Sequence, residues 1–230
     1  EVWNLMGVSA GTKIETDGLV LALDAGNTKS YSGSGTTWSD LSGKGNDGTL
    51  VNSPTYSNLN GGNFNFDEVN DYVNIGSTVI NGTAYTKIAW IRPESACRNI
   101  ISSSGDNGHV MWMNTTDHTV YAGHNTFWGT STARVSHRPN NPGNMLDQWW
   151  CVVVTFSTSS GWAMYFNGEL VDTDSNTDAL IDDSLITFIG AYNFGNLFDG
   201  DIPCVQIYNR ALTASEVQQN FNALRGRFGI

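Results

Sequence analysis

Short runs of alternating apolar and polar residues recur about every ten residues along this chain, separated by Gly, Asn, Ser and Thr. Alternation with a period of two is typical of β-strands with one buried face, and the separating residues are those that turns prefer. The runs span 18–25, 63–67, 71–75, 85–93, 99–103, 109–113, 119–122, 149–156, 162–167, 169–173, 185–190 and 202–208. Because no helical pattern lies between them, the sequence predicts an all-β protein built as an antiparallel two-sheet jelly-roll sandwich, and it argues against an α/β fold.

Two of the runs give more specific predictions. In WWCVVVTF (149–156) both alternating sets are apolar, so we expect a central strand covered on both faces. In the second, Asn167 and Gly168 supply the two positive-φ positions of a type I′ turn, which predicts a hairpin between 162–167 and 169–173.

The end of the chain carries a different signal. Thr213 and Glu216 have the Thr-x-x-Glu spacing of a capping box, and Val217, Phe221 and Leu224 follow at helical spacing. We therefore expect a three-turn amphipathic helix that packs its apolar stripe on the sandwich.

Composition limits the functions that such a domain can have. The chain has 230 residues, enough for one large domain or two small ones, and we take one as the default. With 22 acidic and 11 basic residues its net charge is -11, which opposes binding to nucleic acid. No apolar window approaches the length of about 18 residues that a membrane span needs, so we expect no membrane insertion.

The three cysteines, Cys97, Cys151 and Cys204, cannot all pair within the chain, and none has a Cys-x-x-Cys spacing. Cys151 and Cys204 lie in apolar runs, where a small hydrophobic side chain is expected. We interpret all three as buried free thiols, with a disulfide between two of them as the alternative.

Several of these segments, in this order, resemble the LamG-like members of the concanavalin A-like lectin/glucanase superfamily. They are FDEVNDYVNI (66–75), IAWIRP (88–93), QWWCVVVTF (148–156), YFNGELV (165–171), ITFIGAY (186–192) and FDGDIPCVQIYNRALTASEV (198–217). The resemblance implies the same antiparallel two-sheet jelly roll. One departure is Glu68, which stands where the family usually has Gly, so a positive-φ turn there would be strained.

The opening segment 17–50 and the ending 220–230 are similar, more narrowly, to LamG-like proteins of tailed phages, especially marine ones. That similarity implies a place on the virion surface, in a fibre, an appendage or a capsid decoration. The implied partners are other virion subunits, including further copies of this chain, and a surface glycan of a host cell. We divide the chain into an N-terminal arm or linker (1–17), a LamG-like domain (18–224) and a C-terminal tail (225–230).

The resemblance also implies a structural calcium ion as a possible cofactor. Asp24, at the end of the first strand, and Asp201, in the last one, occupy matching positions, and Asp199 with carbonyls of 42–48 could complete the shell. The alternative is that these aspartates cap turns through their own backbone.

Catalysis is not expected, and a polysaccharide-degrading hydrolase or lyase on the same fold is the less favoured alternative. Glucanases of this superfamily need Glu-x-Asp-x-x-Glu on one strand, and the sequence has no such motif. The acidic cluster at 67–71 has the wrong spacing, and a Gly-x-Ser-x-Gly nucleophile elbow is absent as well.

A sugar-binding site needs an exposed aromatic ring with polar groups at its rim. The region from 112 to 138 is rich in such residues, and we choose Tyr121, His124, Phe127, Trp128 and Arg134 as the carbohydrate-binding candidates. The alternation of HVMWM (109–113) predicts that Trp112 belongs to the core instead, and we expect 123–147 to form an extended loop. The alternative is that these rings fold inward as a second small core or pack against a neighbouring subunit. Burial against another subunit would favour structural assembly of the virion over adhesion.

Overall fold

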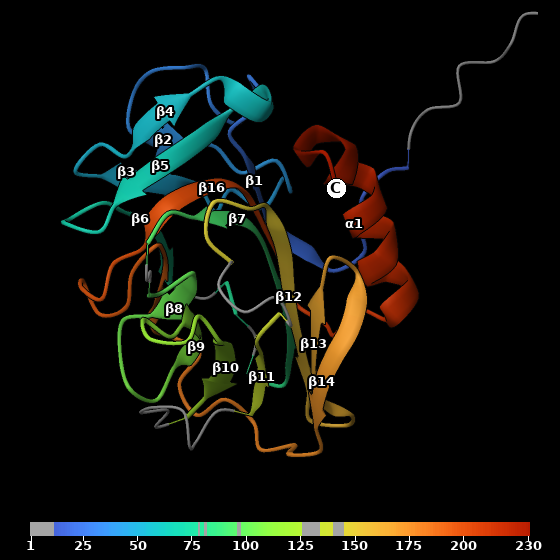
Figure 1. Ribbon diagram of the computed structural model, residues 1–230. Coiled ribbons are helices and arrows are strands. Elements are labelled where there is room, and N and C mark those ends of the chain that lie inside the picture. The colour runs from blue at the N-terminus through green and yellow to red at the C-terminus, as the bar shows by residue number, and fades with distance from the viewer. Residues whose placement is uncertain (1–11, 78, 81, 96–97, 126–133, 140–144) are drawn as a thin grey trace, which may run out of the picture.

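The computed structural model describes residues 12–77, 79–80, 82–95, 98–125, 134–139 and 145–230. Within these residues two β-sheet layers pack face to face, and one long helix lies outside the larger layer (Figure 1). The all-β sandwich predicted from the sequence is confirmed. Among the described residues, no helix is both long and apolar enough to span a membrane.

In the described part of the chain the larger sheet has eight strands, in the order β14-β13-β12-β7-β16-β5-β4 with β1 also paired to β16. Its strands are β1 (Leu19–Asp24), β4 (Thr55–Ser57), β5 (Asn63–Asp67), β7 (Ala84–Pro93), β12 (Trp150–Ser157), β13 (Gly161–Phe166), β14 (Glu169–Asp174) and β16 (Asp199–Tyr208). A 3-10 helix, η1 (Leu59–Gly61), precedes β5.

The second layer consists of two pieces with the orders β2-β3-β6-β15-β8 and β11-β10-β9. An isolated bridge between Asn99 and Trp112 joins them, so they act as one layer. Its strands are β2 (Thr37–Trp38), β3 (Gly48–Val51), β6 (Tyr72–Ser77), β8 (Ile101–Ser103), β9 (His109–Met113), β10 (Val120–His124), β11 (Val135–His137) and β15 (Ile186–Ile189). The strand β11 lies inside the segment that the sequence suggested was a loop, because a three-residue strand carries too little alternation to be seen.

Strand β12 is the central strand that its sequence predicts. It pairs with β7 on one side and β13 on the other. Val152 and Val154 face the core between the two layers, whereas Cys151 and Val153 face the helix side of the sheet, and all four are buried. Cys151 and Cys204 are free thiols that lie on either side of Trp90, so a whole strand separates them. Cys97 lies outside the described residues.

The hairpin and the helix also follow their sequence signals. Asn167 and Gly168 have positive φ angles of 50° and 83° between β13 and β14. The helix α1 (Ala214–Phe228) begins with the complete Thr213/Glu216 capping box and ends at Gly229 in the left-handed conformation. It is longer than the three turns expected and runs past Leu224 into the segment we assigned to a tail.

The turn after β5 has the strain that its sequence suggested. Glu68 has a φ of 59°, a conformation that costs an L-residue about 1 to 2 kcal/mol. Replacing Glu68 with glycine should therefore leave the free energy of unfolding unchanged or raise it by up to about 1 kcal/mol, because the contacts of the carboxylate within the described residues, to Ser95 and Arg98, are long and exposed.

Urea denaturation would measure this change, with Glu68→Ala as the matched control. Alanine removes the same carboxylate but keeps the Cβ atom that makes the left-handed conformation costly. Equal effects of the two substitutions would show that the backbone is not the cause.

Candidate functional site

The outward surface of the second layer is unusually aromatic. Along its strands the residues Val73, Ile189, Met111 and Val120 point into the core, so their neighbours point outward. We call this outward set the outer aromatic face. It consists of Tyr72, Val110, Trp112, Tyr121, Phe188, Tyr192 and Phe194.

Its centre is a stacked pair of rings on neighbouring strands. Trp112 of β9 and Tyr121 of β10 are register partners, and their ring centroids lie 5.1 Å apart at an interplanar angle of 24°. Both side chains are half-buried. The prediction that Trp112 belongs to the core is wrong, because apolar residues occupy both faces of β9 and Met111 and Met113 are the ones that face inward.

A turn between β15 and β16 extends this surface. Tyr192 packs with Val110 beside the stacked pair, and its hydroxyl donates to Asp106 Oδ1 at 2.7 Å. Burial and the neighbouring carboxylate raise the pKa of Tyr192, so it remains a hydroxyl donor at neutral pH. Two residues on, Phe194 is 58% exposed and has a φ of 62°, which is rare for a large side chain. Its ring packs edge-on against Phe188.

Two of the predicted binding residues, Tyr121 and Arg134, lie on the same side of the second layer. Tyr121 pairs with Ser136, and the amide of Arg134 donates to the Ala122 carbonyl, so Arg134 follows on the same side. The Nε of Arg134 is buried and has no hydrogen-bond partner among the described residues. The Arg134 guanidinium lies 3.9 Å from the Asp178 carboxylate, and its side chain is 35% exposed. Phe127 and Trp128 lie outside the described residues.

His124 does not join them, because it is three residues from Tyr121 on the same strand and faces the opposite way. It is 3% exposed and packs against Phe156 and Trp162 in the core. Its Nε2 donates to the Asp178 carbonyl at 2.8 Å, and its Nδ1 accepts from the Tyr85 hydroxyl at 3.2 Å.

The same part of the core holds further polar groups that sequence patterns did not single out. Lys87 is fully buried, and its Nζ donates to the Val110 carbonyl at 3.0 Å and lies 3.4 Å from His109 Nδ1. The other ring nitrogen of His109 lies 3.2 Å from the Thr187 hydroxyl. Burial lowers the pKa of Lys87 and of His109 well below their ordinary values, and we call these linked groups the buried network.

The two aspartates suggested for calcium each lie beside an arginine. Asp24 accepts from Arg227 Nη1 at 2.6 Å, and Asp201 lies 2.6 Å from Arg92 Nη2 and also accepts from Asn65. No group of three or more His, Cys, Asp or Glu side chains suited to a metal occurs within the described ranges. Because a guanidinium already neutralises each carboxylate, the residues as they lie do not fit a shared calcium site.

Comparison with known protein families gives one match. A family model described as "Concanavalin A-like lectin/glucanases superfamily" covers residues 67–218, which is more than half of the chain. A search of curated proteins found no match.

Solved structures share the fold at low sequence identity. Domain 4 of AbnA, an extracellular arabinanase from Geobacillus stearothermophilus in complex with arabinotriose, superposes with a TM-score of 0.67 at 17% identity, over 89% of this chain and 98% of that one. A botulinum neurotoxin type C structure, whose cell entry depends on two ganglioside molecules, gives 0.69 and 16% over 91% of this chain and 52% of that one. Trypanosoma rangeli sialidase with sialic acid gives 0.66 and 16% over 95% of this chain and 36% of that one. The chain thus spans about half of the neurotoxin chain and about a third of the sialidase.

Proposed function

Because the chain belongs to the concanavalin A-like lectin/glucanase superfamily, whose fold is lectin-like, we propose that it is a non-catalytic module that binds carbohydrate on its outer aromatic face. The observation that carries this proposal is the stacked pair of Trp112 and Tyr121 on the open side of the second layer. The sequence motif for glycoside hydrolysis is absent, which supports binding without cleavage.

The chemistry of a sugar matches this surface. A pyranose has an apolar face of C–H groups that packs on an aromatic ring, and hydroxyl groups at its edge that need polar partners. Trp112 and Tyr121 offer the aromatic surface. The Arg134 side chain, which is 35% exposed, offers guanidinium donors, and Asp106 at the Tyr192 hydroxyl offers a carboxylate acceptor. The surface thus combines an aromatic ring with a hydrogen-bond donor and a hydrogen-bond acceptor beside it, which is what sugar binding requires.

The similar structures support the same class of ligand. The arabinanase domain is in complex with arabinotriose, and the neurotoxin depends on gangliosides for cell entry. At 16% to 17% identity they carry no residue-level argument, so the platform rests on the contacts given above.

We further propose that the module is displayed on the surface of a tailed-phage virion, where it would bind a surface glycan of the host cell. The support is the similarity of segments 17–50 and 220–230 to LamG-like phage proteins. A purely structural role in virion assembly is the second candidate. The exposed apolar Phe194, at 58%, favours it, because a partner subunit could cover that ring.

Tyr121→Ala is the first test of the binding function. The purified chain is screened on a glycan array, and the strongest hit is then titrated against the unchanged chain and the variant. Loss of one face of the aromatic stack should weaken binding about tenfold or more, which corresponds to about 1.4 kcal/mol. Leu59→Ala, at a residue that is 68% exposed on η1, is the matched control and should bind as the unchanged chain does.

Repeating the titration with calcium and with a chelator tests whether a calcium ion contributes. A hit that Tyr121→Ala leaves unchanged would place the sugar elsewhere. A folded chain that binds nothing on the array would favour the assembly role, which self-association in analytical ultracentrifugation and its loss in Phe194→Ser would then support.

A further inference from the structure

The helix α1 covers only part of the outward surface of the larger sheet. One row of register partners crosses five strands on that side, from Tyr208 through Thr86, Thr155 and Ala163 to Thr173. The first two are covered, since the Tyr208 hydroxyl donates to the Glu15 carbonyl and the Thr86 hydroxyl bonds the backbone at 210 and 212. The remaining three, Thr155, Ala163 and Thr173, lie on the part of the sheet that α1 does not cover.

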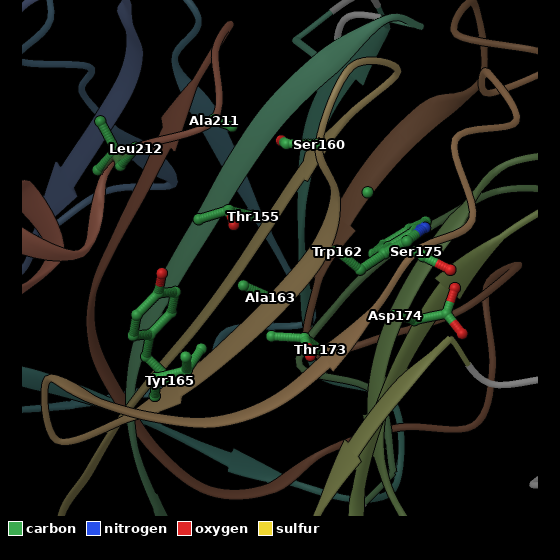
Figure 2. Close-up of a pocket in the computed structure, with 12 residues that line it drawn as sticks. Thr155, Ser160, Trp162, Ala163, Tyr165, Thr173, Asp174, Ser175, Ala211 and Leu212 are labelled. Carbon is green, nitrogen blue, oxygen red and sulfur yellow. The ribbon is translucent and has the colours of Figure 1, made fainter.

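These three residues form the floor of a groove of about 370 Å³ (Figure 2). The floor is low because Thr155, Ala163 and Thr173 have small side chains. Leu212 borders it on the helix side, and Tyr165 and Leu170 border it toward the β13–β14 turn. A volume of this size is within the range of small-ligand sites, about 300 to 1,000 Å³.

Two hydroxyl groups on largely buried residues line this groove and bond no other group in the described part of the chain. Thr155 is 4% exposed and Tyr165 is 6% exposed. Within the described residues neither side-chain oxygen makes a hydrogen bond, in contrast to the fully engaged Thr86 one strand away. Neither oxygen is among the buried unpartnered atoms, so both open into the groove, where a ligand with hydroxyl groups of its own can bond them.

The electrostatics of the lining restrict that ligand further. Among the described residues that line the groove there is neither a lysine nor an arginine. A lining without a cation offers no partner to the carboxylate of an anionic sugar, and the net charge of -11 repels such an anion. The apolar side chains of Leu170 and Leu212 meanwhile suit the C–H face of a ring.

We propose that this groove is a second carbohydrate site, which takes a single neutral hexose-sized sugar unit and rejects sialic acid. Thr155 and Tyr165 bind its hydroxyl groups on the floor, and Leu170 and Leu212 contact its C–H surfaces. This site lies on the opposite side of the sandwich from the outer aromatic face, so either site can bind when the other does not.

A titration of the ¹⁵N-labelled chain tests the groove directly. Glucose, galactose, mannose and N-acetylglucosamine are added separately to millimolar concentration, with sialic acid as the anionic comparator, and amide shifts are followed by NMR. At least one neutral sugar should shift the amides of 155, 163 and 173, and sialic acid should not. Absence of these shifts for all four neutral sugars, or equal shifts with sialic acid, would overturn the proposal.

Two substitutions show whether the shifts come from the groove. Ala163→Leu fills the floor and should abolish them, whereas Tyr121→Ala on the other layer should leave them intact. Thr155→Val keeps the shape and removes the unpartnered hydroxyl, so it should weaken the sugar about tenfold without lowering the melting temperature. Groove shifts that remain unchanged in both Ala163→Leu and Thr155→Val would exclude the site. The outer aromatic face is tested separately, by the titration of Tyr121→Ala with the array hit.

Discussion

Replacing Trp90 with alanine is expected to lower the free energy of unfolding by about 3 to 5 kcal/mol. Trp90 is 1% exposed in the middle of β7, where it joins the larger sheet to α1. Two rings of the helix stack on it, Phe221 at 5.7 Å and 9° and Phe228 at 4.4 Å and 23°. The substitution removes the indole and leaves a cavity that a rigid sheet cannot close, so both the buried area and the ring contacts are lost.

Urea denaturation followed by tryptophan fluorescence and by circular dichroism measures this loss. Ile181→Ala is the control, because that side chain is 69% exposed and its removal should change stability by less than about 0.5 kcal/mol. A loss below about 1 kcal/mol for Trp90→Ala would mean that α1 does not depend on this contact.

Acidification from pH 7 to pH 5 should destabilise the protein through its buried histidines. Burial lowers the pKa of His124 to about 4 and that of His109 well below 6.5. Between pH 6.5 and about 4 the unfolded chain therefore binds more protons than the native one, and the free energy of unfolding falls as the pH falls. For His124 alone the full effect is about 3 kcal/mol, at about 1.4 kcal/mol per pKa unit.

Charged and polar groups around His109 and His124 also shift the pKa values of the two histidines. Lys87 lowers both pKa values and Arg134 lowers that of His124, whereas the Asp178 carbonyl and carboxylate raise it. Asp71, whose pKa burial raises to about 6, works in the opposite sense because its native form gains a proton in the same window. The dependence of the free energy of unfolding on pH therefore combines several groups, and a variant that removes only the histidine is needed to measure its share.

His124→Gln is that variant, since an amide can keep a hydrogen bond to Tyr85 or Asp178 and does not titrate. Chemical denaturation at a series of pH values should show a shallower loss of stability toward pH 5 than in the unchanged chain. His118→Gln removes a histidine outside the buried network and is the matched control. Parallel profiles for His124→Gln and the unchanged chain would exclude His124 as the source of acid lability.

Most of the fold could be predicted from short sequence patterns. The Asn167–Gly168 turn, the Thr213/Glu216 capping box and the doubly apolar strand at 149–156 are each decided by a few adjacent residues, and each is confirmed. The positive φ of Glu68 could also be foreseen, because one departure from a family pattern marked it.

Predicting the candidate site was less successful, for two physical reasons. In 109–113 both alternating sets are apolar, so the strand alone cannot say whether Met111 or Trp112 faces the core, and the packing of the second layer decides it. Tyr121 and His124 could have been separated, because residues three apart on a strand point to opposite faces. The groove could not be predicted, since it depends on register across five strands and on where α1 begins.

The helix α1 also holds the start of the described chain. Its Gln219 donates to the Lys13 carbonyl at 2.9 Å, and its Asn220 accepts from the Glu15 amide at 2.6 Å. Residues 13 and 15 therefore lie with α1 on the helix side of the larger sheet, and the sandwich lies between them and the stacked rings of Trp112 and Tyr121. A copy held on a support through this helix side would turn those rings away from the support. Many copies on one support would then present parallel weak sites, whose combined avidity can exceed the affinity of a single one by orders of magnitude.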